Sequence, residues 1–191
     1  MAGPVTVAAV AAPAKSKFQI PNSKLRLKDS KKLNAVQREK WFKWIKNHSK
    51  IFYAKANVYP KTIDRINISQ AANLAATRAV ARLLGYRVKG MGYRVKVFLD
   101  GGLYLVKSLT PKPYTLYPRT VVKGDEKFNS IKLASIVAKV SRDRIMRRNH
   151  KKFPKYGFDK HVGYGTKSHI RALKKHGICE LHRLTFLQNF I

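Results

Sequence analysis

Short β-branched or apolar runs alternate along this chain with longer runs of helical periodicity. In the clearest helical run, residues 133–148, apolar side chains recur every three or four positions, and lysines and arginines occupy the positions between them. This alternation is typical of an α/β protein in which helices cover a sheet. A length of 191 residues fits one domain, and we expect a single domain over residues 1–191.

The boundaries of the expected elements follow from capping and breaking residues. Asp29 or Ser30 is the expected cap of the first helix. Alanines at i+4 spacing from Ala71 predict a helix with a narrow, closely packed face that ends at Gly85. We predict strands at 5–12, 51–58, 93–99 and 119–122, helices at 30–46, 62–85, 133–148 and 169–175, and loops at 110–117 and 157–166.

Residues 1–28 allow two interpretations. They contain no acidic residue and several lysines and arginines, as a transit peptide would. A secretory signal places basic residues before its apolar stretch, however, and none precedes Lys15. We favour a strand that begins at Val5-Thr6-Val7. The longest nearly uncharged run, 5–14, is too short to cross a bilayer, so we expect a cytoplasmic protein without membrane contact.

The charge balance indicates the class of partner. The chain has 41 lysines and arginines against 9 acidic residues, a formal net charge of +32. Such an excess destabilises an isolated domain by self-repulsion and favours a polyanionic partner, above all nucleic acid. An apolar content of 45% argues against general disorder. A single cysteine, Cys179, excludes a disulfide scaffold and a zinc finger.

Two acidic residues stand out from the nine. Asp100 follows an apolar strand and precedes a Gly-Gly turn, where α/β sheets commonly present functional groups. An ordinary turn aspartate is the alternative. Asp143 lies within the helix over 133–148, between two arginines, where a surface ion pair is the alternative. The local sequence alone does not decide the role of either residue.

Several short blocks occur in the order found in type 2 ribonucleases H. The block at 134–143, Ala-Ser-Ile-Val-Ala-Lys-Val-Ser-Arg-Asp, is the most specific. The chain therefore resembles bacterial ribonuclease HII from its first residues to about Phe186. The other blocks are KDSKKL at 28–33, IDRINI at 63–68, FLDG at 98–101, KGD at 123–125, GYGTK at 163–167 and HR at 182–183.

This resemblance implies a fold and an activity. The fold is α/β and ribonuclease H-like, with a mixed five-stranded sheet flanked by helices and a small helical C-terminal part at about 150–191. Family members cleave the RNA strand of RNA–DNA hybrids and cut at ribonucleotides embedded in DNA. Four carboxylates hold two divalent ions, one activating water and the other stabilising the leaving oxygen. Hard oxygen ligands of this kind suit Mg²⁺ or Mn²⁺.

The resemblance also assigns site residues, each with a simpler alternative. Asp100 and Asp143 match the third and fourth metal-binding carboxylates and would be both catalytic and metal-binding. Tyr164 matches a tyrosine that stacks on the sugar beside the cleaved bond, although a loop tyrosine more often only packs. The remaining substrate-binding positions, each also explicable as an ordinary surface residue, are Lys31, Lys32, Lys123, Lys139 and Thr166. Ser30, Ser135 and His182 match as well, with capping, close packing and a buried core histidine as their alternatives.

One expected element is absent from the chain as given. In the family, a central strand ending in Asp-Glu-Ala-Gly-Arg-Gly precedes the segment that corresponds here to Ala2–Val10, and it supplies the first two carboxylates. The one Asp-Glu pair in this sequence, Asp125-Glu126, overlaps the KGD block at 123–125, which matches a different segment of the family. We therefore expect an incomplete sheet and an incomplete metal site. Either the start of the chain is misassigned or truncated, or the chain is a degenerate homologue retained for binding.

Three functions remain open from the sequence. The first is a ribonuclease HII-type endonuclease, expected to be a monomer, that acts on RNA–DNA hybrids and ribonucleotide-containing DNA. The second is a catalytically inactive, basic RNA-binding or ribosome-associated protein on the same fold, which the net charge of +32 favours. The third is an architectural DNA-binding protein, but the sequence has no wedge or arm signature.

Overall fold

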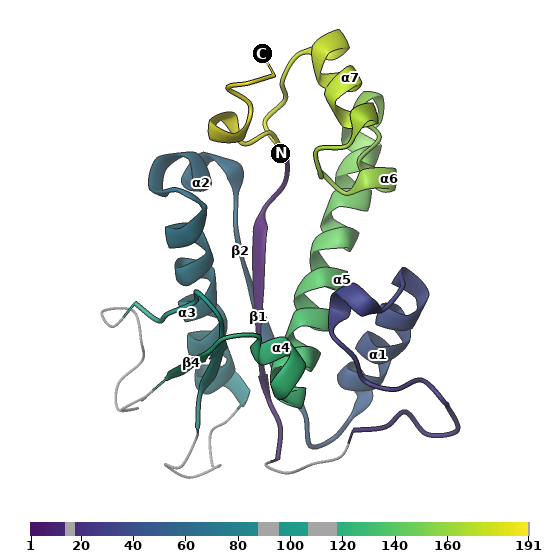
Figure 1. The fold of residues 1–191 in the computed structure, drawn as a ribbon, viewed down its shortest axis with the longest axis vertical. Helices are drawn as coiled ribbons and strands as arrows, with labels where there is room; N and C mark the ends of the chain where they lie inside the picture. Colours follow the sequence, from purple (N-terminus) through teal and green to yellow (C-terminus); the bar gives the residue numbers. More distant parts are fainter. Residues whose placement is uncertain (14–17, 88–95, 107–117, 191) are drawn as a thin grey trace.

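The computed structural model describes residues 1–13, 18–87, 96–106 and 118–190. Its strands and helices alternate as the sequence predicts, and the fold is mixed α/β (Figure 1). Short 3-10 helices lie at Ser30–Lys32, Pro154–Tyr156 and Leu184–Phe186. The strands are β1 (Val5–Ala11), β2 (Phe52–Val58), β3 (Phe98–Asp100) and β4 (Arg119–Val121), and the helices are α1 (Ala35–Asn47), α2 (Pro60–Ile66), α3 (Ile68–Arg87), α4 (Gly124–Lys127), α5 (Asn129–Lys152), α6 (Phe158–His161) and α7 (Lys167–His176).

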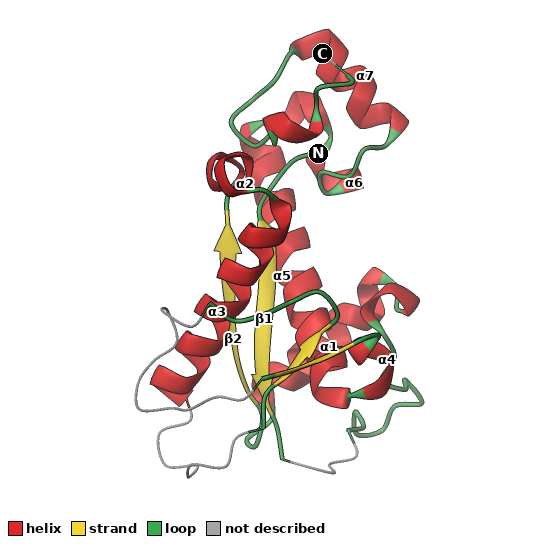
Figure 2. Cartoon of the chain, turned by 60° about the vertical axis from the view of Figure 1, so that its left-hand side comes forward, coloured by secondary structure: helices red, strands yellow, loops and turns green. Residues whose placement is uncertain are grey.

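Helices cover both faces of the β1–β2 pair. α3 lies on one face, and α5 with α1 on the other (Figures 1 and 2). Alternate residues of β1 therefore enter different cores. Val7, Ala9 and Ala11 pack with Leu83 and Leu99 on the α3 side. On the α5 side, Ala8 and Val10 pack against a cluster made of Leu33, Trp41, Phe42, Ile45, Ile51, Leu133, Ile136, Val137 and Val140.

The predicted alanine face of α3 explains why this helix lies so close to the strands. Ala71, Ala75 and Ala79 are fully buried. Small side chains at i+4 spacing let the helix backbone approach the sheet. Gly85, however, does not end the helix, which continues to Arg87. The helical run also breaks once, at Asn67, whose φ of 65° separates α2 from α3.

The four strands form two separate pairs within the described residues. β1 runs antiparallel to β2, with Val5 opposite Val58, and β3 runs parallel to β4, with Leu99 opposite Thr120. β3 shares the α3-side core with β1, but no ladder of the described residues joins the two pairs. Every residue of β1 is only half-buried. The resemblance implies a five-stranded sheet from which the central strand is missing. Within the described residues, the remaining sheet consists of two separate two-stranded pairs.

Several predicted boundaries are wrong. Asp29 caps a 3-10 helix by accepting from the Lys31 N–H, whereas Asn34 caps α1 in a reciprocal pair with Gln37. The loop expected at 157–166 contains the short helix α6. Residues 93–95 of the strand predicted at 93–99 and the whole of the loop predicted at 110–117 lie outside the described residues. The strand that the structure describes there begins at Phe98. The strand at the N-terminus is confirmed as β1.

The C-terminal helical part packs on the first residues of the chain (Figure 1). Ala2 is fully buried in a cluster with Met146, Tyr156, Phe158 and Leu181. The Ala2 N–H donates to the Gly163 carbonyl at 3.0 Å, and the Gly3 N–H donates to the Leu181 carbonyl at 2.7 Å. Ala2 and Gly3 are therefore packed inside this end of the fold. No helix in the described ranges is long and apolar enough to span a membrane.

Asp64 fastens the C-terminal segment to α2. Its carboxylate accepts hydrogen bonds from the backbone N–H groups of Leu184 and Thr185, at 2.9 and 3.1 Å, and from the Thr185 hydroxyl at 2.7 Å. Burial raises the pKa of Asp64, but these hydrogen bonds and nearby Arg183 outweigh it, so the pKa lies below its ordinary value of 3.8. The charged carboxylate is therefore the form that holds the segment.

Replacing Asp64 by Asn should destabilise the protein by about 1 kcal/mol, as the loss of a helix cap does. Since the pKa of Asp64 is lower in the folded state, its contribution is present above the unfolded-state pKa and is lost as pH falls through the folded-state pKa. Urea unfolding at pH 7 and at pH 3 measures both effects. Glu180→Gln, at an exposed position, is the control. An equal loss in the two variants at pH 7 would contradict the assignment.

Candidate active site

Asp143 is a buried carboxylate on α5, with 6% of the residue exposed. Lys139, one turn earlier, places its Nζ 3.2 Å from Oδ1, and the Arg38 guanidinium of α1 lies 3.8 Å from Oδ2. The contact with Lys139 is an ion pair without hydrogen-bond alignment, because Oδ1 has no hydrogen-bond donor. This buried oxygen therefore has a cation beside it but accepts no hydrogen bond.

Arg38 connects this carboxylate to the segment at 29–33. Its Nη1 donates to the Ser30 carbonyl at 3.1 Å and to the Leu33 carbonyl. Arg38 was not predicted as a site residue, although the sequence contains a signal for it. Arg38, Trp41 and Ile45 occur at i, i+3 and i+7, which places the arginine on the buried face of α1. A cation on such a face requires a partner, and Asp143 is that partner.

Asp100 lies at the end of β3 and organises the turn into α4. Its Oδ1 accepts hydrogen bonds from the Gly101 and Gly124 N–H groups, each at 3.0 Å. A Cβ on Gly124 would lie 2.6 Å from Ile131 Cδ1 and 3.2 Å from Asp100 Oδ1, so a larger residue here would displace both side chains. Lys123, just before it, has a left-handed φ of 55° and an exposed side chain. Asp100 thus stabilises the turn through Oδ1, and its second carboxylate oxygen accepts no hydrogen bond from the described residues.

The predicted substrate-binding residues Lys31 and Lys32 lie against α4. Lys31 Nζ is 3.6 Å from Asp125, and Lys32 Nζ is 3.9 Å from Glu126. Asp125 is buried, whereas both lysines are largely exposed. Exposed ion pairs of this length contribute little to stability. These lysines are therefore available to other anions while they stay near α4.

Tyr164 lies beside Asp143 through a shared lysine. Lys139 Nζ donates to the Tyr164 hydroxyl at 3.1 Å, and the same nitrogen lies 3.2 Å from Asp143. Tyr164 faces the solvent, with 52% of the residue exposed. The Arg142 guanidinium lies 5.2 Å from the centroid of the Tyr164 ring. Thr166, predicted as a substrate-binding residue, caps α7 by accepting from the His169 N–H at 3.3 Å. We refer to Asp143, Lys139, Arg38 and Tyr164 as the Asp143 cluster.

A protein-family model described as Ribonuclease HII matches residues 1–189. The chain belongs to the ribonuclease HII family. Curated relatives agree: ribonuclease HII of Acetivibrio thermocellus is 42% identical over 191 residues, and that of Bacillus mycoides is 40% identical over 186 residues. They cover 100% and 97% of this chain, which in turn spans 66% and 64% of their lengths, slightly under two-thirds.

Two solved structures support the fold. One is the PCNA:RNase HII complex from Archaeoglobus fulgidus, with a TM-score of 0.65 and 24% identity, covering 96% of this chain and 87% of the other. The other is ribonuclease H2 from Pyrococcus horikoshii, with a TM-score of 0.61 and 21% identity, covering 94% and 93%. The ribonuclease H-like fold predicted from the sequence is confirmed.

The two matched carboxylates of this ribonuclease HII-family chain fit a divalent cation in their chemistry, and one oxygen of each accepts no hydrogen bond from the described residues. They do not form a complete site. Within the ranges that the structure describes, no group of three or more His, Cys, Asp or Glu side chains is arranged to hold a metal ion. All nine acidic residues lie in those ranges. Asp100 and Asp143 are therefore not joined by a third acidic residue, histidine or cysteine into a metal-holding group in these ranges.

Proposed function

We propose that this chain carries part of a ribonuclease HII-type endonuclease that cleaves the RNA strand of RNA–DNA hybrids and cuts DNA at embedded ribonucleotides. The Asp143 cluster carries the proposal, because a single lysine, Lys139, lies between a buried carboxylate and an exposed tyrosine. Metal chemistry and sugar recognition would thus meet on one face of α5. The comparisons support the same class of activity through the family.

Asp100 and Asp143 would hold Mg²⁺ or Mn²⁺, which supply an activated water and a charge that stabilises the leaving oxygen. The residues of this chain have separate roles. The exposed face of Tyr164 would stack on the ribose beside the scissile bond, and Lys139 holds that ring next to Asp143. Lys31, Lys32 and Lys123 would contact phosphates along the strand, and Thr166 would fix the Tyr164 loop through its cap on α7.

A catalytically inactive RNA-binding or ribosome-associated protein is the second candidate, favoured by the net charge of +32. Both candidates bind nucleic acid, so they differ in recognition of the ribose and in cleavage. We further propose that the chain acts as a monomer and that residues 1–191 form one domain whose C-terminal extension is residues 150–191.

We expect the protein to bind RNA–DNA hybrid and duplex nucleic acid with little sequence preference and strong salt dependence. Each phosphate contact should steepen the fall of log K with log salt by about 0.9. A duplex with one embedded ribonucleotide should bind several-fold more tightly than the all-DNA duplex. Tyr164→Ala should remove this preference and leave the salt slope unchanged, because the ring reads the sugar and not the phosphates.

Fluorescence titrations at several salt concentrations measure both quantities. Tyr59→Ala, at a tyrosine of similar exposure (53%) on α2's N-terminal side, is the control and should keep the ribose preference. Equal binding of the two duplexes by the unmodified protein would favour the RNA-binding alternative. Affinity that does not respond to salt would reject the electrostatic account of either function.

A further inference from the structure

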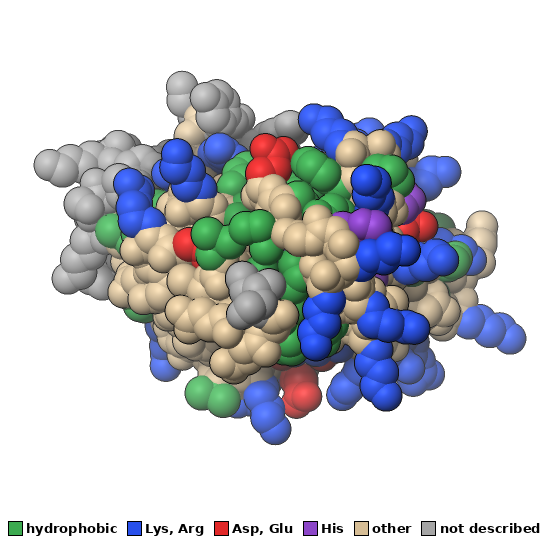
Figure 3. Space-filling model, turned by 90° about the horizontal axis from the view of Figure 1, so that it is seen from above, with side chains coloured by type: hydrophobic (Ala, Val, Ile, Leu, Met, Phe, Trp, Pro, Cys, Tyr) green, Lys and Arg blue, Asp and Glu red, His purple; other side chains and the backbone are tan. Residues whose placement is uncertain are grey.

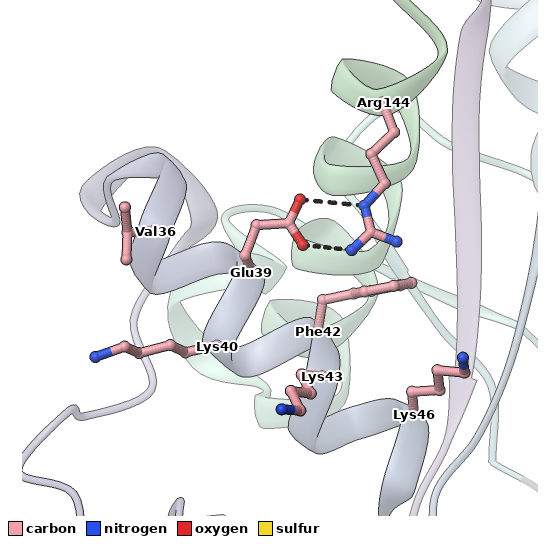
Figure 4. A pocket seen from close by; sticks show the side chains of 7 residues that line it. All are labelled: Val36, Glu39, Lys40, Phe42, Lys43, Lys46 and Arg144. Atoms are coloured by element: carbon pink, nitrogen blue, oxygen red, sulfur yellow. Dashed lines mark hydrogen bonds and ion pairs between the residues drawn. The ribbon is translucent and has the colours of Figure 1, made fainter. Parts of the chain in front are cut away.

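The outer face of α1 carries a basic groove that the proposed active site does not use. Its lining includes Phe42 and three exposed lysines, Lys40, Lys43 and Lys46, together with Arg144 from α5 (Figure 4). We refer to these five residues as the α1 groove. Lys40 and Lys43 also line a second hollow, toward Trp44 and His48, that contains no acidic residue. These two lysines therefore lie between two adjacent hollows of the same surface.

Glu39, an acidic residue that also lines the hollow of the α1 groove, is already paired. Arg144 donates from Nε to Glu39 Oε1 at 3.1 Å and from a second nitrogen to Oε2, and its guanidinium lies 4.6 Å from the Phe42 ring centroid (Figure 4). Such a two-bond pair is the most specific form of carboxylate binding by arginine. Lys40, Lys43 and Lys46 have no carboxylate partner, and every acidic residue lies in the part of the chain that the structure describes.

Three of the four lysines of the proposed active site differ in this respect, whereas Lys123 has no carboxylate partner among the described residues. Lys31, Lys32 and Lys139 each lie within 4 Å of a carboxylate, at 3.6, 3.9 and 3.2 Å. The least compensated positive charge near α1 is thus on its outer face and not beside Asp143. The face of the molecule seen from above also carries many Lys and Arg side chains and only a few acidic ones (Figure 3).

The positive charge continues from the α1 groove toward β2. Lys55 on β2 donates from Nζ to the Ser141 hydroxyl of α5 at 3.2 Å. Burial lowers the pKa of Lys55, and the nearby charges of Arg148 and Arg144 lower it further. Three cations from two elements therefore repel one another across this junction. Clustered like charges of this kind destabilise the fold unless an anion binds among them.

The α1 groove and the Asp143 cluster lie on different faces of α5. Successive helical residues are rotated by about 100°, because an α-helix has 3.6 residues per turn. Asp143 faces Lys139 and Arg38, whereas Arg144, the next residue, faces Glu39 and Phe42. A nucleic acid held at the Asp143 cluster reaches the α1 groove only by extending past α1. The groove is therefore suited to the flanking part of a long substrate.

We propose that the α1 groove binds the phosphate backbone of nucleic acid outside the proposed active site and anchors the flanking part of the substrate. The proposal rests on the proposed function for its neighbouring site. It predicts that the groove contributes affinity without reading sequence or sugar, because lysines contact phosphates as point charges. A long hybrid should use the groove, and a hybrid of about one helical turn, roughly 10 base pairs, should not.

The test compares two triple variants. Lys40→Gln/Lys43→Gln/Lys46→Gln removes three exposed charges from α1, and Lys61→Gln/Arg65→Gln/Arg78→Gln removes three exposed charges from α2 and α3 on the opposite face of the β1–β2 pair. Affinities for 30- and 10-base-pair hybrids are measured from about 0.05 to 0.5 M salt. Thermal unfolding shows that both variants fold.

For the long hybrid, the α1 variant should bind at least about tenfold more weakly at 0.1 M salt, with a salt slope smaller by about 2.7, since each of the three lost contacts removes about 0.9. Its affinity for the short hybrid should change no more than that of the control. Equal effects of the two variants on the long hybrid would overturn the proposal. Loss of the ribose preference described for Tyr164, with the length effect intact, would instead count against the proposed function.

Discussion

Replacing Arg142 by methionine is expected to lower the free energy of unfolding by about 3–5 kcal/mol. The Arg142 guanidinium donates to the carbonyls of Ala2, Pro4 and Val162 at 3.0, 3.1 and 2.8 Å. Methionine keeps the apolar stem but leaves these carbonyls without their donor. Each buried polar group left unpaired costs about 1–3 kcal/mol, against a total stability of about 5–15 kcal/mol.

The predicted loss has a structural reason beyond the number of hydrogen bonds. Arg142 joins the first residues of the chain to the C-terminal helical part, and Arg183 repeats the connection by donating to the Gly3 carbonyl at 2.8 Å. Burial lowers the pKa of Arg142, while nearby Tyr164 and Asp143 raise it. The arginine therefore remains charged at the junction, and its removal should loosen the loop that carries Tyr164.

Urea unfolding of the two proteins measures this effect. Arg147→Met, on the exposed side of the same helix, is the matched control and should change stability by less than about 0.5 kcal/mol. A loss below 1 kcal/mol in Arg142→Met would show that the junction does not depend on this guanidinium. Two separate transitions, with the first lost in the variant, would show that the C-terminal part unfolds by itself.

Elements with strong periodicity were predictable from the sequence. The apolar stripe over 133–148 and the alanines of α3 each predicted a helix, and both helices are confirmed. The first has longer bounds than predicted, whereas the second is divided into α2 and α3. Boundaries were less predictable, because they depend on particular hydrogen bonds. Asn34 caps α1 through Gln37, and Asn67 adopts a left-handed φ between α2 and α3. Neither asparagine interrupts the apolar pattern that defines the helices.

The candidate site was predictable only through the resemblance. Asp143 reads locally as a surface ion pair, and the structure does pair it with Lys139 and Arg38. Its burial distinguishes it, and burial at this position depends on α1 packing against α5, which the local sequence does not encode. Arg142 illustrates the same limit. It was counted only as one basic residue among many, whereas three carbonyls from distant segments converge on it.

The site as given should not hydrolyse RNA–DNA hybrid or cut at an embedded ribonucleotide with Mg²⁺ or Mn²⁺. Two carboxylates provide too little negative charge to hold two divalent ions close together. Gel assays of labelled duplexes with each ion test this expectation. Metal-dependent cleavage that disappears in Asp100→Asn would show that another acid completes the site. The activity of this unextended protein is the reference for the gain of cleavage expected from the extended chain.

A strand ending in Asp-Glu-Ala-Gly-Arg-Gly, joined ahead of Ala2, should produce both stability and cleavage. β1 has one strand partner among the described residues and is half-buried throughout, while β3 lies across the same core without a ladder to it. A strand between them would pair with both edges, and its backbone hydrogen bonds should add at least about 2 kcal/mol. Its two carboxylates would join Asp100 and Asp143.

The extended chain should then cleave 5′ to an embedded ribonucleotide in the presence of Mg²⁺ or Mn²⁺. Asp100→Asn is the more informative knockout, because an Asn Oδ1 still accepts from Gly101 and Gly124, whereas Asp143→Asn also removes the charge that pairs with Lys139 and Arg38. In the extended chain, Asp100→Asn should reduce cleavage by at least about 100-fold, since loss of a supporting residue alone costs 10–100-fold. It should leave the gained stability intact. An extended chain that is stable but inert would favour the RNA-binding function, because the sheet would then be complete without a working metal site.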